Sequence, residues 1–108
     1  MVELEATTQK NNETVPRWKY AVPTRPVTLG RVADQSEWAV PWDDTVSRKH
    51  AHIQYQEGEY RICDDESEFG TRVFRDGRQI EVPSGNRRGE RLRPGDEIYL
   101  GRACLRFE

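Results

Sequence analysis

The sequence has no apolar run long enough to cross a lipid bilayer, and its first residues carry neither the basic nor the apolar part of a signal peptide. Cysteine is scarce as well. Cys63 and Cys104 lack the Cys-x-x-Cys spacing of a metal site, and two cysteines in an intracellular chain are more often free thiols than a disulfide. We therefore expect a cytoplasmic protein with no segment inserted in a membrane.

Positive charge shows no excess, because 17 Lys and Arg residues face 19 Asp and Glu residues and the net charge is −2. A chain of this composition has no overall electrostatic attraction for nucleic acid or for acidic membranes. Nucleic acid is therefore not an expected partner. Any site that binds an anion must be local, built from a few cations that loops hold together.

Helical periodicity is missing too. No apolar stripe at helical spacing runs for a dozen residues, whereas short alternating segments are separated by turns such as Glu57-Gly58-Glu59 and Asp76-Gly77. A length of 108 residues suits one domain. These patterns predict a single all-β domain over residues 17–108. Residues 1–16 are polar and aperiodic, and we expect them to form a flexible tail.

Three polar segments stand at the ends of expected strands. They are Gly30-Arg31 after the strand-like run Val27–Leu29, Ser47-Arg48-Lys49-His50 before an alternating segment, and the polar turn Ser67–Thr71. A hydroxyl and several cations at the rim of a sheet can bind an anion without being buried. The sequence therefore points to loops that face a phosphate.

The order and spacing of these motifs resemble the forkhead-associated (FHA) family over about residues 18–108. The matching segments are Gly30-Arg31, Ser47-x-x-His50-Ala51, Asp64-x-x-Ser67-x-x-Gly70-Thr71-x-Val73, Leu92-x-x-Gly95-Asp96-x-Ile98-x-Leu100-Gly101 and the closing Leu105-x-Phe107. The resemblance implies an all-β, two-sheet sandwich of about eleven mostly antiparallel strands, with its binding loops at one end. We expect no cofactor.

The resemblance also implies roles for single residues. In the FHA family, residues at the positions of Arg31 and Ser47 bind the phosphate of a phosphothreonine, and the residue after the serine, here Arg48, often adds a contact. The histidine at the position of His50 holds the binding loops together. The other residues expected to organise the site are Gly30, Gly70 and Thr71.

The chain departs from the family at Glu68 and Phe69. FHA domains commonly carry a small polar residue and then an Asn at these two positions, and the Asn side chain hydrogen-bonds the bound peptide. Phe69 lacks the groups for that bond, and Glu68 places a negative charge beside the expected phosphate. Phe69 can instead offer an apolar contact to the peptide. Both residues belong to the expected phosphopeptide-binding site.

Two functions follow from this pattern. The first is a phosphothreonine-peptide-binding interaction module in Ser/Thr kinase signalling. Its ligand is a phosphothreonine-containing protein, or the chain's own first residues if Thr7 or Thr8 is phosphorylated. The alternative is an FHA fold with a degenerate pocket at Glu68 and Phe69 that binds a folded protein partner without phosphate.

An enzyme is not expected. Ser47 and His50 suggest a nucleophile and its base, but no Gly-x-Ser-x-Gly elbow surrounds the serine. His50 and His52 lack a third well-spaced ligand for a metal. We therefore expect neither catalytic residues nor a metal site.

Overall fold

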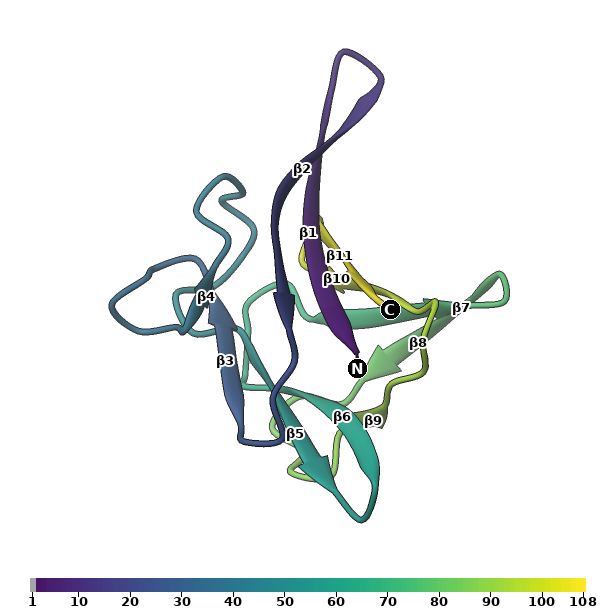
Figure 1. Ribbon diagram of the computed structural model, residues 1–108. Coiled ribbons are helices and arrows are strands. Elements are labelled where there is room, and N and C mark those ends of the chain that lie inside the picture. Colours follow the sequence, from purple (N-terminus) through teal and green to yellow (C-terminus); the bar gives the residue numbers. More distant parts are fainter. Residues whose placement is uncertain (1) are drawn as a thin grey trace.

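The computed structural model describes residues 2–108, and over this range the chain forms eleven strands in two sheets (Figure 1). One sheet has the order β2-β1-β11-β10-β7-β8 and the other has the order β4-β3-β5-β6-β9. The strands are β1 (Glu3–Lys10), β2 (Glu13–Ala21), β3 (Val27–Gly30), β4 (Trp38–Ala39), β5 (Ala51–Gln56), β6 (Glu59–Asp64), β7 (Thr71–Arg75), β8 (Arg78–Val82), β9 (Glu90–Arg91), β10 (Glu97–Leu100) and β11 (Ala103–Phe107).

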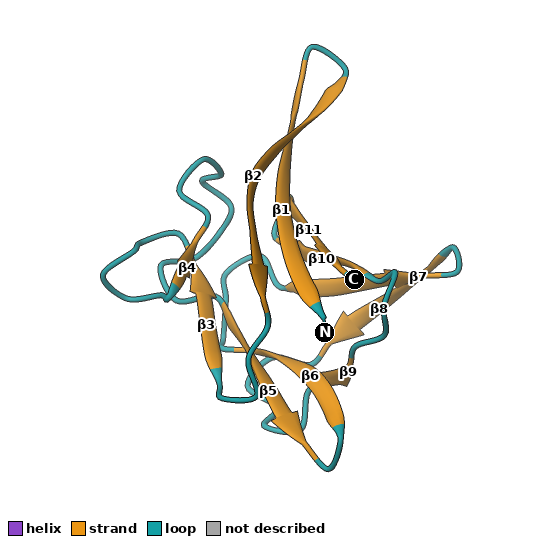
Figure 2. Ribbon diagram, in the orientation of Figure 1, coloured by secondary structure: helices purple, strands orange, loops and turns teal. Residues whose placement is uncertain are grey.

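Nearly all neighbouring strands run antiparallel, while the short β4 pairs with β3 in parallel. Turns and loops connect them, and no helix occurs within residues 2–108 (Figure 2). The expected all-β, two-sheet sandwich of about eleven strands is confirmed. The described part of the chain accordingly holds no helix long and apolar enough to span a membrane.

The hydrophobic core lies between the two sheets, because alternate residues of each strand point inward. On β11, Ala103, Leu105 and Phe107 are at most 4% exposed, and the residues between them face outward. Leu29 of β3 and Ile53 of β5 approach from the other sheet and are at most 1% exposed. This core fixes the strand ends from which the polar loops extend.

The predicted flexible tail is wrong for the residues of the first hairpin. Residues 3–10 form β1, which pairs with β11 on one side and β2 on the other. Leu4 and Ala6 are fully buried, and Leu4 lies opposite Phe107. Asn11 and Asn12 have φ angles of 53° and 65°, which suit a tight two-residue turn. The polar residues of this hairpin project past the sandwich (Figure 1), so only its base shows an apolar pattern.

Candidate functional site

Three loops meet where the sequence predicted an anion site. Backbone hydrogen bonds join them: the Arg31 N–H donates to the Ser47 carbonyl, the His50 N–H donates to the Leu29 carbonyl, and the Asp65 N–H donates to the His50 carbonyl, each over 2.9 Å. The loops that follow β3, β4 and β6 are therefore tied to one another. Their side chains share one rim of the sandwich, as predicted.

Arg31 is half-buried at the end of β3, with its guanidinium held from one side. Its Nε donates to the carbonyl oxygen of Val46 over 3.0 Å. Within residues 2–108 its two terminal amino groups have no hydrogen bond or ion pair. A planar fork anchored through Nε and free at its outer edge suits two oxygens of one phosphate.

Ser47 is oriented by two neighbours. Its Oγ accepts a hydrogen bond from the Glu68 N–H over 3.0 Å, and its own N–H donates to Nδ1 of His50 over 3.0 Å. Because the oxygen already accepts a bond from Glu68, the hydroxyl hydrogen is free to donate elsewhere. Ser47 therefore offers a ligand one positioned donor, and its carbonyl ties it to the backbone of Arg31.

His50 is fully buried between the loops. Nδ1 accepts from Ser47, so the ring proton sits on Nε2, which donates to the Gly70 carbonyl over 2.9 Å. Burial lowers the pKa of His50 from its ordinary value of 6.5, although the Gly70 carbonyl and the charges of Asp64 and Asp65 act in the opposite direction. The ring is a neutral link between two loops, and this arrangement gives no support to a nucleophile–base pair.

Gly30 and Gly70 belong to the loops that His50 joins. A Cβ on Gly30 would overlap the carbonyl oxygen of Arg48 and the Oγ of Ser36, so the loop that carries Arg48 packs directly on a bare backbone. Gly70 has a φ of 83°, a conformation that side-chain-bearing residues rarely adopt. Gly30 therefore lets two segments approach each other closely, whereas Gly70, where a Cβ would meet nothing within 4 Å, supplies the backbone conformation of its turn.

Asp64 is a part of the site that the sequence prediction did not assign a role. It is 1% exposed, and its carboxylate accepts hydrogen bonds from the Thr71 hydroxyl over 2.6 Å and from both the N–H and the hydroxyl of Ser67. The Ser67 Oγ in turn accepts from the Gly70 N–H over 3.0 Å. This network shapes the turn that presents Glu68. Its signal in the sequence is the spacing of Asp64, Ser67 and Thr71.

The remaining predicted contact residues lie on the surface. Arg48, Glu68 and Phe69 are exposed, and Phe69 keeps 59% of its surface open to solvent. Within residues 2–108 the Glu68 carboxylate has no ion pair, and only its backbone N–H is used. The structure therefore brings Arg31, Ser47 and the Glu68 backbone together, while Phe69 forms an apolar point on the same turn.

Two other sequence features lie apart from this cluster. His52 bonds through Nδ1 to both oxygens of Asp65, at 2.9 and 3.0 Å, and the described residues contain no group of three potential metal ligands. Thr7 and Thr8 lie within β1, where Thr8 faces Val15 in the neighbouring strand. The predicted self-binding would require β1 to leave the sheet, so the structure argues against it.

Comparisons with known proteins point to the same family as the sequence motifs. A family model described as FHA domain matches residues 27–101. An oxoglutarate dehydrogenase inhibitor from Corynebacterium efficiens is 40% identical over 65 residues, which are 60% of this chain but only 39% of that relative's length.

Solved structures extend the likeness to the whole chain. The FHA domain of FhaA, crystallised with the intracellular domain of another protein, has a TM-score of 0.70 at 22% identity and covers 100% of both chains. EmbR of Mycobacterium tuberculosis, in complex with a low-affinity phosphopeptide, has a TM-score of 0.63 at 21% identity over 99% of this chain and 24% of that one. These likenesses show the same fold.

Proposed function

This chain belongs to the FHA domain family, and from that premise we propose that it is a phosphothreonine-peptide-binding module acting in Ser/Thr kinase signalling in the cytoplasm. FHA domains are generally phosphothreonine-binding modules. Arg31 and Ser47 bind the phosphate, and Arg48 adds positive charge beside it. The ligand is a phosphothreonine-containing segment of another protein.

One observation supports this proposal: Arg31 and Ser47 each have a hydrogen-bond donor that bonds nothing within residues 2–108, and the segments that carry them are joined by a hydrogen bond. The outer edge of the Arg31 guanidinium is free, and the Ser47 hydroxyl already accepts from Glu68 and has only its hydrogen to give. A phosphothreonine supplies about −1.5 to −2 charges and three acceptor oxygens. A phosphate can therefore accept hydrogen bonds from both donors, which stand on segments joined by a backbone bond.

Glu68 and Phe69 change how the peptide is held. The Glu68 carboxylate repels a dianion if it turns toward the phosphate, and the nearby cations Arg48 and Lys49 oppose that effect. Phe69 replaces a hydrogen bond to the peptide backbone with an apolar surface, 59% of which is exposed. We therefore expect the peptide to rely on its phosphate and on an apolar side chain near the phosphothreonine.

The test is fluorescence-polarisation binding of a degenerate phosphothreonine peptide library, with the unphosphorylated library in parallel. Arg31→Ala removes the charge-assisted bonds, worth roughly 1.5–3 kcal/mol each, so affinity should fall by about 100-fold or more. Arg88→Ala is a matched control, because this exposed arginine lies beside the turn between β5 and β6, outside the cluster. Equal binding of both libraries, or unchanged binding by the Arg31 variant, would refute the proposal.

A second candidate function rests on Phe69. An exposed aromatic ring where the family commonly has an Asn suits assembly with a folded protein without phosphate. In that case Phe69→Ala weakens partner binding and Arg31→Ala leaves it intact. The same pair of variants therefore separates the two functions, since phosphate reading requires Arg31 and assembly requires Phe69.

The relatives suggest a setting for either function. The chain aligns with 39% of the length of a protein named as an oxoglutarate dehydrogenase inhibitor, and this name supports a regulator that binds an enzyme. We extend the proposal to that class of partner: a protein whose activity changes when this domain binds it. Co-purification of an enzyme only after kinase treatment, and its loss in Arg31→Ala, is the expected result.

A further inference from the structure

The two sheets have four edge strands, and they differ in their capacity to pair with another chain. β4 and β9 have two residues each, which is too short to hold an added strand. β2 is long, but Pro16 lacks a backbone N–H and the register with β1 is broken between Ala6 and Thr7. β8 has five residues and no proline. It is the edge best suited to accept a further strand.

The backbone of β8 has free hydrogen-bonding groups. The two turn residues between Arg75 and Arg78 have φ angles of 51° and 75°, a tight turn that makes Arg75 and Arg78 a hydrogen-bonded pair. Such pairs alternate along an antiparallel ladder, so Gln79 and Glu81 direct their N–H and C=O groups away from β7. Within residues 2–108 no other strand pairs with β8, and both residues are exposed.

A groove of about 440 Å³ runs beside this edge. Its lining residues are Arg75, Asp76, Arg78, Gln79, Ile80 and Arg93. Ile80 is half-buried and packs against the core, so it offers an apolar contact beside the free backbone. The groove therefore combines three features that an extended peptide uses: backbone partners, an apolar contact and charge.

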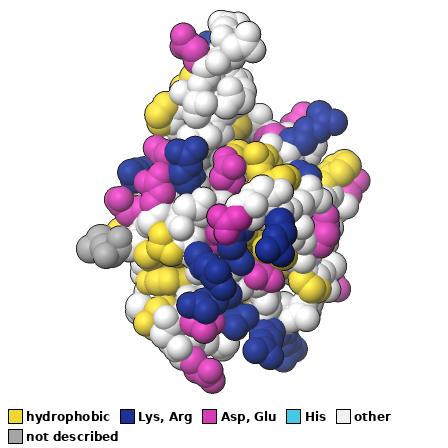
Figure 3. Space-filling model, turned by 90° about the vertical axis from the view of Figure 1, so that its right-hand side faces the viewer, with side chains coloured by type: hydrophobic (Ala, Val, Ile, Leu, Met, Phe, Trp, Pro, Cys, Tyr) yellow, Lys and Arg dark blue, Asp and Glu magenta, His cyan; other side chains and the backbone are white. Residues whose placement is uncertain are grey.

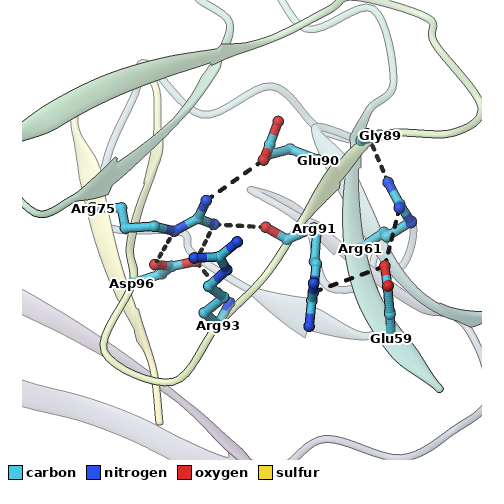
Figure 4. A network of polar contacts seen from close by, with 8 residues as sticks. All are labelled: Glu59, Arg61, Arg75, Gly89, Glu90, Arg91, Arg93 and Asp96. Carbon is cyan, nitrogen blue, oxygen red and sulfur yellow. Dashed lines mark hydrogen bonds and ion pairs between the residues drawn. The ribbon is translucent and has the colours of Figure 1, made fainter.

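The charges in the groove are of two kinds (Figure 4). Arg75 is fully used, with Nε and Nη2 bonded to the Asp96 carboxylate over 2.9 and 2.7 Å and Nη2 also bonded to the Arg91 carbonyl. Arg78 and Arg93 are exposed, and neither has an ion pair within residues 2–108. Asp76 opposes them with one negative charge. Figure 3 shows Lys and Arg side chains gathered over the centre and lower part of this side of the molecule.

We propose that the β8 edge binds an extended acidic segment of a partner protein, which adds a strand to the six-stranded sheet and places carboxylates on Arg78 and Arg93. The free N–H and C=O groups of Gln79 and Glu81 match another peptide backbone. Nucleic acid fits less well, because its closely spaced phosphates come beside Asp76 and Glu81, whereas a peptide can place carboxylates only at Arg78 and Arg93. A second copy of this chain would bring more arginines to a groove that already has two unpaired ones.

This site is separate from the phosphate-binding loops. β7 starts at Thr71, which belongs to the loop cluster, and ends at Arg75, next to the groove, so the length of that strand separates the two places. One partner can therefore occupy both sites, and the inference stands whether or not the loops bind phosphate.

The test is display selection of short random peptides on the intact chain. Displayed peptides carry no phosphate, so the loop cluster does not drive the selection. We expect enriched peptides in which acidic and apolar residues alternate. On binding of a synthetic copy, amide exchange at Gln79 and Glu81 should slow by about 10-fold or more, because both N–H groups enter the sheet.

Two variants and one control sharpen the result. Gln79→Pro removes an outward N–H and leaves the bonds to β7 in place, and the double variant Arg78→Glu with Arg93→Glu reverses the charge. Each should weaken binding of the selected peptide by about 10-fold or more. Arg102→Glu, which reverses an exposed arginine elsewhere, should change it by less than about two-fold.

Several outcomes would overturn the proposal. They are the absence of acidic peptides among those enriched, full binding by folded Gln79→Pro, a duplex oligonucleotide that competes as well as the peptide, and a concentration-dependent dimer that Gln79→Pro abolishes. The oligonucleotide result would assign the groove to nucleic acid, and the dimer result would assign the edge to a second copy. Thermal unfolding of each variant confirms that lost binding is not lost folding.

Discussion

At one end of the sandwich Arg31 uses a single guanidinium nitrogen, Nε, which donates to the Val46 carbonyl over 3.0 Å. At the other end Arg75 uses all three: two bond to the Asp96 carboxylate and the Arg91 carbonyl, and the third lies 3.7 Å from Glu90. The hydrogen bonds with Asp96 raise the pKa of Arg75. Arg75 therefore joins β7 to the start of β10, whereas the two terminal amino groups of Arg31 bond nothing within residues 2–108.

The buried carboxylates of Asp64 and Asp96 also differ in the groups that satisfy them. Asp64 and Asp96 are both 1% exposed, and each fixes a turn. Asp64 is satisfied by the hydroxyls of Thr71 and Ser67, which are neutral donors, while Asp96 is satisfied by the cation Arg75. At the loop end, Asp64 is satisfied by hydroxyls, and within residues 2–108 no carboxylate forms an ion pair with Arg31. The difference shows that an arginine can stay unpaired when the buried carboxylate at its end of the sandwich already accepts hydrogen bonds from other donors.

The comparison is tested most strongly by Arg75→Ala. The variant leaves the Asp96 carboxylate buried without its cation, and breaking a buried pair in this way costs about 3–5 kcal/mol. Chemical denaturation should show that loss in the free energy of unfolding. Arg31→Ala, measured in the same way, should cost less than about 1 kcal/mol, because it removes one bond to a carbonyl. Equal losses in the free energy of unfolding of the two variants would contradict the distinction between a paired Arg75 and an unpaired Arg31.

A smaller effect is expected for Ser47→Ala. The variant removes the donor to the phosphate and the acceptor for the Glu68 N–H, so peptide affinity should fall by roughly 1.5–3 kcal/mol, about 10- to 150-fold. The free energy of unfolding should fall by about 1 kcal/mol. Titration calorimetry with a selected phosphopeptide measures the first, and Thr24→Ala, which removes an exposed hydroxyl from the turn between β2 and β3, serves as the control. Unchanged affinity would mean that Ser47 stabilises the loop but does not bind the phosphate.

Gly30→Ala tests how closely the loops pack. Gly30 is the one glycine of the eight whose φ is not positive, so it is needed for space and not for conformation. A methyl group there meets the Arg48 carbonyl, and relief of that overlap should cost about 1–3 kcal/mol of stability and weaken peptide binding. Gly58→Ala, in an open turn, should lower stability without changing affinity. Preserved binding in Gly30→Ala would show that the Arg48 segment is free to shift.

Much of this architecture could be predicted from the sequence. Turn pairs and alternating segments indicate an all-β domain, and the resemblance carried by Gly30, Ser47 and Gly70 implies that three loops lie together. The turns and alternating segments can be recognised from neighbouring residues, and the family motifs occur in a fixed order along the chain. The expected sandwich and loop cluster follow from these two kinds of pattern.

The first hairpin could not be predicted in the same way. Only Leu4 and Ala6 of β1 are buried, and their partners on β11 lie about a hundred residues away in the chain. The pairing of Arg75 could not be predicted for the same reason, because its partner Asp96 lies 21 residues away. The family pattern predicted a role for Arg31, but not the bond from its Nε to the Val46 carbonyl that holds the guanidinium.

The smallest expected effect concerns His50, whose neutral ring links Ser47 to Gly70. Burial lowers the pKa of His50 below its ordinary value of 6.5, so the unfolded chain takes up this proton at a higher pH than the folded one. The contribution of His50 to the free energy of unfolding is full well above pH 6.5 and should decline as the pH falls through 6.5 toward the folded pKa. Urea unfolding between about pH 7.5 and about pH 5.5 measures the slope.

His52→Gln isolates that titration, because it leaves His50 as the chain's single histidine. The slope should persist in this variant and coincide with titration of the His50 ring signals in NMR spectra. A flat profile, or stability that rises as the pH falls, would contradict a neutral buried ring.

Protonation of His50 also removes the acceptor for the Ser47 N–H, so phosphopeptide affinity should decline over the same pH range. The Arg75–Asp96 pair has no imidazole, and the opposite end of the sandwich should keep its amide-exchange protection while the loops lose theirs.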